Sequence, residues 1–197
     1  MPFATVLVLI CLRSVVAGQS AEAPPNIASR PFSAEQLTVY RTALVSWYRS
    51  EKAKVNLGLL TEPIATSDDS LDKACLKGLS LEAAPAGQVH RIRPEDLIQL
   101  GPFAFHLVDP KVGSQEVSEN DPGHSIQKGK PVDEAVENGF AHGLLTLGEI
   151  QFDKGHNNAV VSFSFQCGRL CGNGTKMLMA KKDGVWKRMR QCGGWVS

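Results

Sequence analysis

The chain has 197 residues, with 21 Lys and Arg, 20 Asp and Glu, and a formal charge of +1 at pH 7. This balance disfavours a protein that binds nucleic acid or an anionic membrane, since such proteins carry a basic excess. Residues 1–18 have the pattern of a secretory signal peptide that is cleaved near Gly18. Their apolar run, 4–12, is too short to span a bilayer as a helix, and no other run predicts a membrane span.

Cleavage of the signal peptide leaves an even number of cysteines. Cys11 is removed, while Cys75, Cys167, Cys171 and Cys192 remain. In an oxidising location, either periplasmic or secreted, four cysteines predict two disulfides. We favour Cys167–Cys171 with Cys75–Cys192, and the alternative joins Cys75 to Cys167 and Cys171 to Cys192.

The N-terminal part of the mature chain predicts a leader and a helix. Residues 19–31 are rich in Ala, Pro and Ser, which indicates a flexible leader before a single domain over 32–197. Ser33 is the expected N-cap of the helix, with Gln36 completing a capping box. Apolar and aromatic residues then recur at helical spacing and form a face that would dock on a sheet: Leu37, Tyr40, Leu44, Trp47 and Tyr48.

The middle of the chain predicts short elements. Strands are expected over 88–93 and 103–108, with a short helix beginning at Pro94 between them. The polar, glycine-containing run 111–130 predicts a long surface loop. A helix is expected over 131–142.

The C-terminal quarter predicts four consecutive antiparallel strands. The run 159–167 alternates apolar and polar residues, which is the period of a half-buried strand. An apolar run over 144–152 precedes it. Runs 175–182 and 185–192 follow a glycine-rich turn over 167–174 and are joined by Asp-Gly, a strong hairpin signal. We therefore expect an α+β fold, with an N-terminal amphipathic helix packed on an antiparallel sheet that ends in a four-stranded C-terminal meander.

This region also carries a composite motif, F-D-x-x-H-x-x-A-x-V-x-x-x-x-x-C-G-x-L-C-G-x-G, then K-x-D-G-x-W and W-V-S. Its residues here are Phe152, Asp153, His156, Ala159, Val161, Cys167, Gly168, Leu170, Cys171, Gly172, Gly174, Lys181, Asp183, Gly184, Trp186, Trp195, Val196 and Ser197. The motif resembles an uncharacterised family of secreted bacterial proteins over the last quarter of the chain. The resemblance implies export and a shared C-terminal module, and it implies no reaction.

Local signatures of catalysis are missing from the sequence. There is no G-x-S-x-G, no phosphate loop of the G-x-x-x-x-G-K type and no H-E-x-x-H, so we predict no cofactor and no metal site. A weak catalytic candidate is His156 with Asp153 or Glu149, because a carboxylate can orient an imidazole that acts as a general base. A hydrogen-bonded loop that fixes the hairpin is the simpler interpretation, and the sequence does not decide whether the chain is an enzyme.

The last hairpin is basic and aromatic. Lys187, Arg188 and Arg190 lie between Trp186 and Trp195, a combination that predicts a surface for a protein or glycan partner. The alternative is a charged edge strand that prevents aggregation. Our first hypothesis is a non-enzymatic exported binding domain. The others are the small hydrolase-like enzyme just described, which needs a concave pocket, and a structural protein of the envelope.

Overall fold

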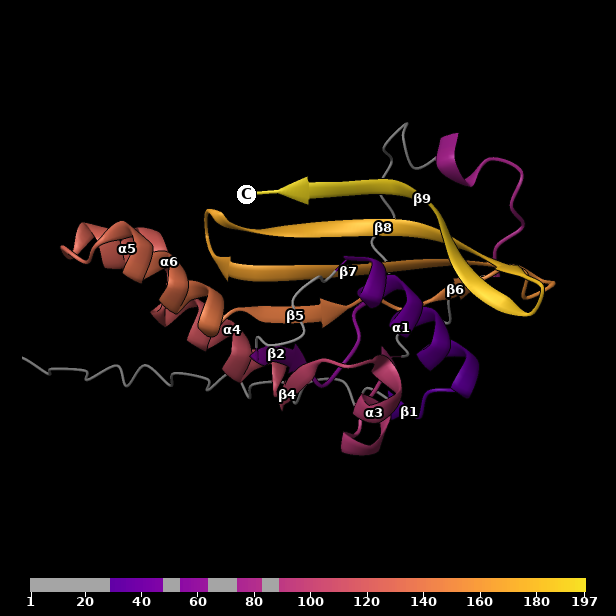
Figure 1. Ribbon diagram of the computed structural model, residues 1–197, viewed down its shortest axis with the longest axis horizontal. Helices are drawn as coiled ribbons and strands as arrows, with labels where there is room; N and C mark the ends of the chain where they lie inside the picture. Colours follow the sequence, from indigo (N-terminus) through magenta and orange to yellow (C-terminus); the bar gives the residue numbers. More distant parts are fainter. Residues whose placement is uncertain (1–28, 48–53, 64–73, 83–88) are drawn as a thin grey trace, which may run out of the picture.

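The computed structural model describes residues 29–47, 54–63, 74–82 and 89–197 (Figure 1). The signal peptide predicted over 1–18 lies outside these residues. Of the predicted leader, Ser29–Arg30 form strand β1, which pairs in parallel with β3 (Val89–His90). None of the described helices has both the length and the apolar character needed to cross a membrane.

The structure is α+β, as predicted, and its centre is a largely antiparallel sheet of seven strands in the order β4-β2-β5-β7-β8-β9, with β6 also paired to β7. The strands are β2 (Lys54–Gly58), β4 (Ala104–Val108), β5 (Leu144–Leu147), β6 (Gln151–Phe152), β7 (Asn158–Gly168), β8 (Cys171–Lys182) and β9 (Val185–Val196). β7 pairs antiparallel with β5, β6 and β8, and β8 pairs antiparallel with β9.

Part of this sheet is parallel, which corrects the expectation of a purely antiparallel sheet. β2 pairs in parallel with β4 on one side and with β5 on the other. Its residues Val55 and Leu57 are buried. Both neighbours of β2 are far away in sequence, and no local pattern around β2 indicates such a pairing.

The surface loop predicted over 111–130 is wrong, because this segment contains α4 (Pro110–Glu119) and α5 (Pro122–Gln127). Each helix begins with Asp-Pro. Asp109 and Asp121 accept hydrogen bonds from the backbone N–H of Lys111 and His124, both at 2.9 Å. The proline that follows occupies the first helical position, where no N–H is needed. α6 (Val132–Ala141) then follows.

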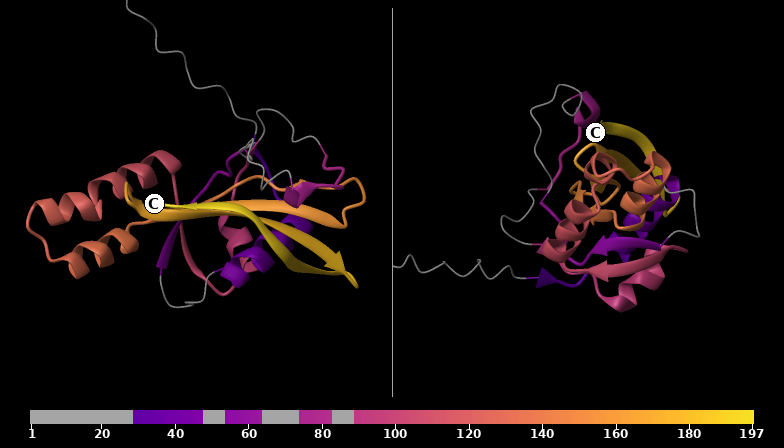
Figure 2. Two further views of the ribbon diagram at one scale, coloured as in Figure 1. Left: turned by 90° about the horizontal axis from the view of Figure 1, so that it is seen from above. Right: turned by 90° about the vertical axis from the view of Figure 1, so that its left-hand side faces the viewer.

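Helix α1 (Ala34–Trp47) covers one face of the sheet (Figures 1 and 2). Ser33 and Gln36 exchange the two bonds of a capping box, with Ser33 N–H donating to Gln36 Oε1 at 2.8 Å and Gln36 N–H donating to Ser33 Oγ at 3.2 Å. The buried side of α1 packs in one cluster with the inward side chains of β7 and β8, and the short elements η1 (Pro94–Asp96) and α3 (Leu97–Leu100) lie beside it. Tyr40 anchors the helix by donating from its hydroxyl to the carbonyl of Gly148 at 2.7 Å.

The two hairpin connections of the C-terminal strands are tight. Asp183 and Gly184 both have positive φ, 53° and 77°, as expected for the Asp-Gly turn between β8 and β9. The connection from β7 to β8 is shorter than predicted, because β7 extends to Gly168 and β8 begins at Cys171. Gly172 and Gly174 therefore lie within β8, not in a turn.

Two disulfides join the four described cysteines. Cys167–Cys171 closes the β7–β8 connection, and Cys75–Cys192 ties segment 74–82 to β9. This confirms the favoured pairing and excludes the alternative one. Around the second bond, Cys75 and Cys192 pack with Val160 and Leu178 in a small cluster on the face of the sheet opposite α1.

Thr175 on β8 leads to a prediction about stability. The residue is 8% exposed, and its Oγ1 has no hydrogen-bond partner among the described residues. A buried hydroxyl without a partner costs about 1–3 kcal/mol. Thr175→Val keeps the branched shape and removes the hydroxyl, so we expect the free energy of unfolding in urea to rise by about 1 kcal/mol. Thr61→Val is the matched control and should lower it, because the Thr61 hydroxyl donates to Glu149. A loss of stability in Thr175→Val would contradict this account.

Candidate functional site

The weak catalytic candidates of the sequence do not converge. His156 lies in the hairpin loop with its Nδ1 3.0 Å from Oε2 of Glu35, and its ring stacks on Phe152 at 4.7 Å. Asp153 and Glu149 each have other partners. His156 is therefore held at the surface by a hydrogen bond with Glu35 of α1, without the carboxylates expected from the sequence.

Asp153 closes the hairpin. Its Oδ1 accepts from the backbone N–H of Asn157 and Asn158 at 2.8 and 3.0 Å, and its Oδ2 accepts from the Asn158 side chain at 2.7 Å. Burial raises the pKa of Asp153, but these hydrogen bonds outweigh it, and the pKa lies below its ordinary value. This is the hydrogen-bonded loop that was the simpler interpretation of the sequence.

Glu149 forms a buried pair with His90, a partner that its position in the sequence does not indicate. Oε2 of Glu149 lies 2.8 Å from Nδ1 of His90, and Oε1 accepts from the Thr61 hydroxyl and from the His90 backbone N–H. The Glu149 residue is 9% exposed. Burial raises the pKa of Glu149, but the hydrogen bonds from His90 and Thr61 overcome it and hold the pKa below its ordinary value.

The other nitrogen of His90 is occupied as well. The Nε2 atom of Gln36 lies 3.3 Å from Nε2 of His90. Because Oε1 of Gln36 accepts from Ser33, the amide nitrogen faces the ring and donates to it. Both ring nitrogens of His90 thus have a hydrogen-bond partner. With both ring nitrogens engaged, this pair links the cap of α1 to β3 and to the segment after β5, and it is not placed to act as a general base.

The residues of the basic hairpin that were predicted to form one binding surface have different settings in the structure. Trp186 is 4% exposed and its ring packs against Phe152 at 5.9 Å, so it belongs to the core. Arg190 donates to the carbonyl of Cys75. Lys187 and Arg188 are exposed on β9, which is the last strand of the sheet. Their position fits the charged edge strand that was the alternative interpretation.

Trp195 has a different setting from Trp186. Its ring lies over Gly172 and Gly174 of β8, and the residue is 43% exposed. A Cβ atom on Gly174 would stand 2.2 Å from Nε1 of the indole, and one on Gly172 would stand 3.2 Å from Cη2. The two glycines therefore leave the space that lets the indole rest on the sheet.

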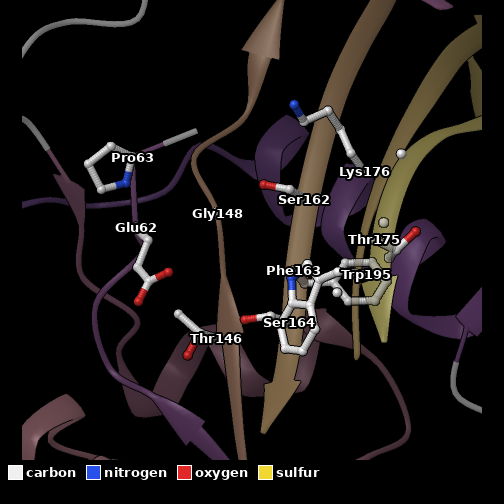
Figure 3. Close-up of a pocket in the computed structure, with 13 residues that line it drawn as sticks. Glu62, Pro63, Thr146, Gly148, Ser162, Phe163, Ser164, Thr175, Lys176 and Trp195 are labelled. Atoms are coloured by element: carbon white, nitrogen blue, oxygen red, sulfur yellow. The ribbon is translucent and has the colours of Figure 1, made fainter. Parts of the chain in front are cut away.

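A cavity of about 280 Å³ opens beside this indole (Figure 3). Its floor consists of side chains on the sheet face opposite α1: Thr146 on β5, Ser162 and Ser164 on β7, and Lys176 on β8. The pairing register places them together, since Ser164 pairs with Thr146 and Ser162 pairs with Lys176. We call Thr146, Ser162, Ser164, Lys176 and Trp195 the open face.

Of the segments that the structure describes, two cover this side of the sheet and leave the open face between them. Segment 74–82 covers one end, held by the Cys75–Cys192 disulfide. At the other end α4 packs Val117 against Leu144 and Val108. Figure 3 shows Glu62 and Pro63 along the side of the cavity away from Trp195. The cavity is thus a recess whose walls come from segments far apart in the sequence.

The hydroxyl groups and the indole N–H of the open face are available to a ligand. Within the part of the chain that the structure describes, no hydrogen bond engages the hydroxyls of Thr146, Ser162 and Ser164 or the indole N–H of Trp195. All three hydroxyl residues are half-buried. The exposed carboxylate of Glu62 and the amine of Lys176 add one charge of each sign. Convergent polar groups beside an aromatic ring are the usual composition of a small-molecule site.

Only Trp195 of this set was singled out from the sequence. The serines were recognised as the polar face of a strand, and their meaning depends on β8, where Gly174 stands opposite Ser164 and leaves room for the indole. Polar residues at every second position of β7, of which Ser164 and Gln166 face glycines on β8, were the signal for this site. It becomes visible only with the pairing register.

Comparisons with known proteins find no matching family model, no matching characterised protein and no matching solved structure. Among the described residues, no group of three or more His, Cys, Asp or Glu side chains is placed to hold a metal ion. The function is therefore inferred from the geometry of the open face.

Proposed function

We propose that the protein is an exported, disulfide-stapled binding module without a catalytic step, and that it holds a sugar of a glycan on its open face. One observation carries the proposal. Four hydrogen-bonding groups without a partner among the described residues, on Thr146, Ser162, Ser164 and Trp195, surround one recess. Sugar hydroxyls donate and accept hydrogen bonds, as serine and threonine hydroxyls do.

The proposed architecture explains why the sheet face opposite α1 is left partly uncovered by the described segments. In this proposal the C-terminal strands act as a meander, and helix α1 covers the side of it that carries Phe163 and Met177. Side chains alternate along each strand. The residues that alternate with Phe163 on β7 and with Met177 on β8 therefore point to the other side of the sheet. There, among the described parts of the chain, segment 74–82 and α4 cover only the ends.

The chemistry of the recess favours a neutral, polyhydroxylated ligand. The indole of Trp195 offers an apolar ring and a polar N–H at the same place. Glu62 and Lys176 have opposite charges, so the recess has no net charge that would select a strongly charged polymer. A cavity of about 280 Å³ is close to the lower end of ligand sites, and we expect a dissociation constant of about 0.1–1 mM, or roughly −4 to −5.5 kcal/mol.

Export is supported by the two disulfides, since such bonds persist in oxidising compartments, and by the signal peptide predicted over 1–18. The mature protein is expected to begin near residue 19. N-terminal sequencing of the protein recovered from the periplasm or the medium tests this part of the proposal. An uncleaved, cytoplasmic protein with five free thiols would contradict it.

Calorimetric titration with the cello-oligosaccharide and chito-oligosaccharide series tests the binding function. We expect saturable binding of at least one series, weakened at least about tenfold, or 1.4 kcal/mol, by Trp195→Ala. Trp195→Phe keeps an aromatic ring without the N–H, so its affinity should lie between those of the wild-type protein and Trp195→Ala. Thermal melting of each variant shows that it is folded.

A matched variant separates the open face from the basic edge strand. Lys187→Ala/Arg188→Ala removes two exposed cations from β9 and should leave the affinity unchanged. If this double variant loses binding while Trp195→Ala retains it, the edge strand is the site and the proposal is wrong. Absence of binding to both series would also overturn it.

A further inference from the structure

We infer that the ligand of the open face is a linear chain of sugars that runs along β7, past Trp195, into a second recess beside α4. The inference rests on the proposed function. The second recess has a volume of about 320 Å³ and is lined by Ser114 and Ser118 of α4 together with Gln166 of β7. Trp195 lines both recesses, so they are neighbours on one surface.

Both recesses lie on the same face of the sheet. Ser162, Ser164 and Gln166 occupy alternate positions of β7 and therefore point to the same side. Four residues of strand at about 3.3 Å each place Gln166 roughly 13 Å from Ser162. This distance exceeds the length of one sugar ring, so a ligand that bonds to both ends of the row must contain several units.

The indole of Trp195 connects the two recesses. Gly174 pairs with Ser164, and Gly172 pairs with Gln166. The Nε1 end of the indole lies over Gly174, and the Cη2 end lies over Gly172. One end of the ring therefore stands beside the first recess and the other beside the second, as expected for a platform on which adjacent sugars of one chain rest.

Helix α4 provides the hydroxyls of the second recess. Ser114 and Ser118 are about one helical turn apart and lie on one side of α4. Val117, which lies between them in the sequence, packs on Leu144. Both serines and Gln166 are exposed. No hydrogen bond within the described part of the chain engages their side chains, so these groups are available to a second and a third sugar.

Chain length tests the inference. In calorimetric titrations with one to four N-acetylglucosamine units, or with the corresponding cello-oligosaccharides if that series binds, we expect the affinity to rise at least tenfold from the monosaccharide to the trisaccharide and then to level off. Gln166→Ala/Ser118→Ala should reduce the trisaccharide affinity to that of the monosaccharide and leave monosaccharide binding unchanged. Ser164→Ala should weaken both.

Gln115→Ala is the matched control. Gln115 is on α4 and bonds to Glu119 at 2.7 Å, and it does not line the recess, so its loss should change neither affinity. Equal affinities for one and three units would overturn the inference and leave the proposed function standing. If no member of either series binds, the proposed function fails, and the inference fails with it.

Discussion

Replacement of both Cys75 and Cys192 by alanine should lower the free energy of unfolding by about 4–5 kcal/mol, the largest effect that we expect from any small change. The bond joins residues 117 apart, and a crosslink that closes a long loop removes much conformational freedom from the unfolded chain. The measurement is urea unfolding of the oxidised protein and of the double variant at pH 7.

The second disulfide is the internal control for this effect. Cys167 and Cys171 are only four residues apart, so their replacement by alanine should cost about 2 kcal/mol in the same treatment of loop closure. If the two double variants lose equal stability, or if the short bond has the larger effect, the Cys75–Cys192 bond does not have the role assigned to it.

Glu149→Ala should destabilise the protein by about 3 kcal/mol. The substitution leaves Nδ1 of His90 without its partner and removes the carboxylate from the His90 backbone N–H and the Thr61 hydroxyl, which keep only Thr61 Oγ1 and the His90 carbonyl as acceptors in a largely buried place. Urea unfolding measures the loss. Glu137→Gln, on the exposed side of α6, should change stability by less than about 0.5 kcal/mol.

The same carboxylate makes stability depend on pH. Folding lowers the pKa of Glu149 below its ordinary value of 4.5. The stabilisation is therefore complete above that value and is lost as pH falls through the lower pKa of the folded state. Glu149→Gln should reduce the loss of stability at acid pH, which we call the acid limb of the stability curve. The loss that remains is due to Glu35, Asp121 and Asp153, whose pKa values are lowered too. An unchanged acid limb in Glu149→Gln would contradict the buried pair.

The parts of the fold that follow from local patterns could be predicted from the sequence. The alternation over 159–167 and the Asp-Gly pair identify β7 and the β8–β9 turn, and Cys167–Cys171 closes the short connection between neighbouring strands. The central strand β2 could not be predicted in this way. Its partners begin at Ala104 and Leu144, and pairing over such separations depends on the whole sheet.

Asp-Pro pairs and glycines can each have two structural roles, and the sequence alone did not indicate which role applied. The strand expected over 103–108 does end just before Asp109-Pro110, but these two residues also begin α4, with the Asp109 carboxylate as its cap. Gly172 and Gly174 were interpreted as turn formers, whereas in the sheet they make room for the ring of Trp195. In both cases the function of the residue depends on what its neighbours in space require.

Only one residue of the candidate site could be predicted from the sequence. Trp195 was expected to contact a ligand together with Trp186, but Trp186 is buried against Phe152. The hydroxyls that surround Trp195 come from β5 and β7. Because these strands meet β9 only through β8, spacing along the chain could not bring them together.

The most direct test of the central claim is the indole region of a ¹H–¹⁵N correlation spectrum, recorded while chitotriose and then cellotriose are added. The protein has three tryptophans. Trp47 packs on Phe163 at 5.0 Å and Trp186 is buried, whereas Trp195 borders the open face. We predict that the Nε1–H signal of Trp195 shifts in a saturable manner while those of Trp47 and Trp186 stay in place. A Trp195 signal that remains fixed at millimolar concentrations of both sugars would contradict the claim that the open face is a glycan site.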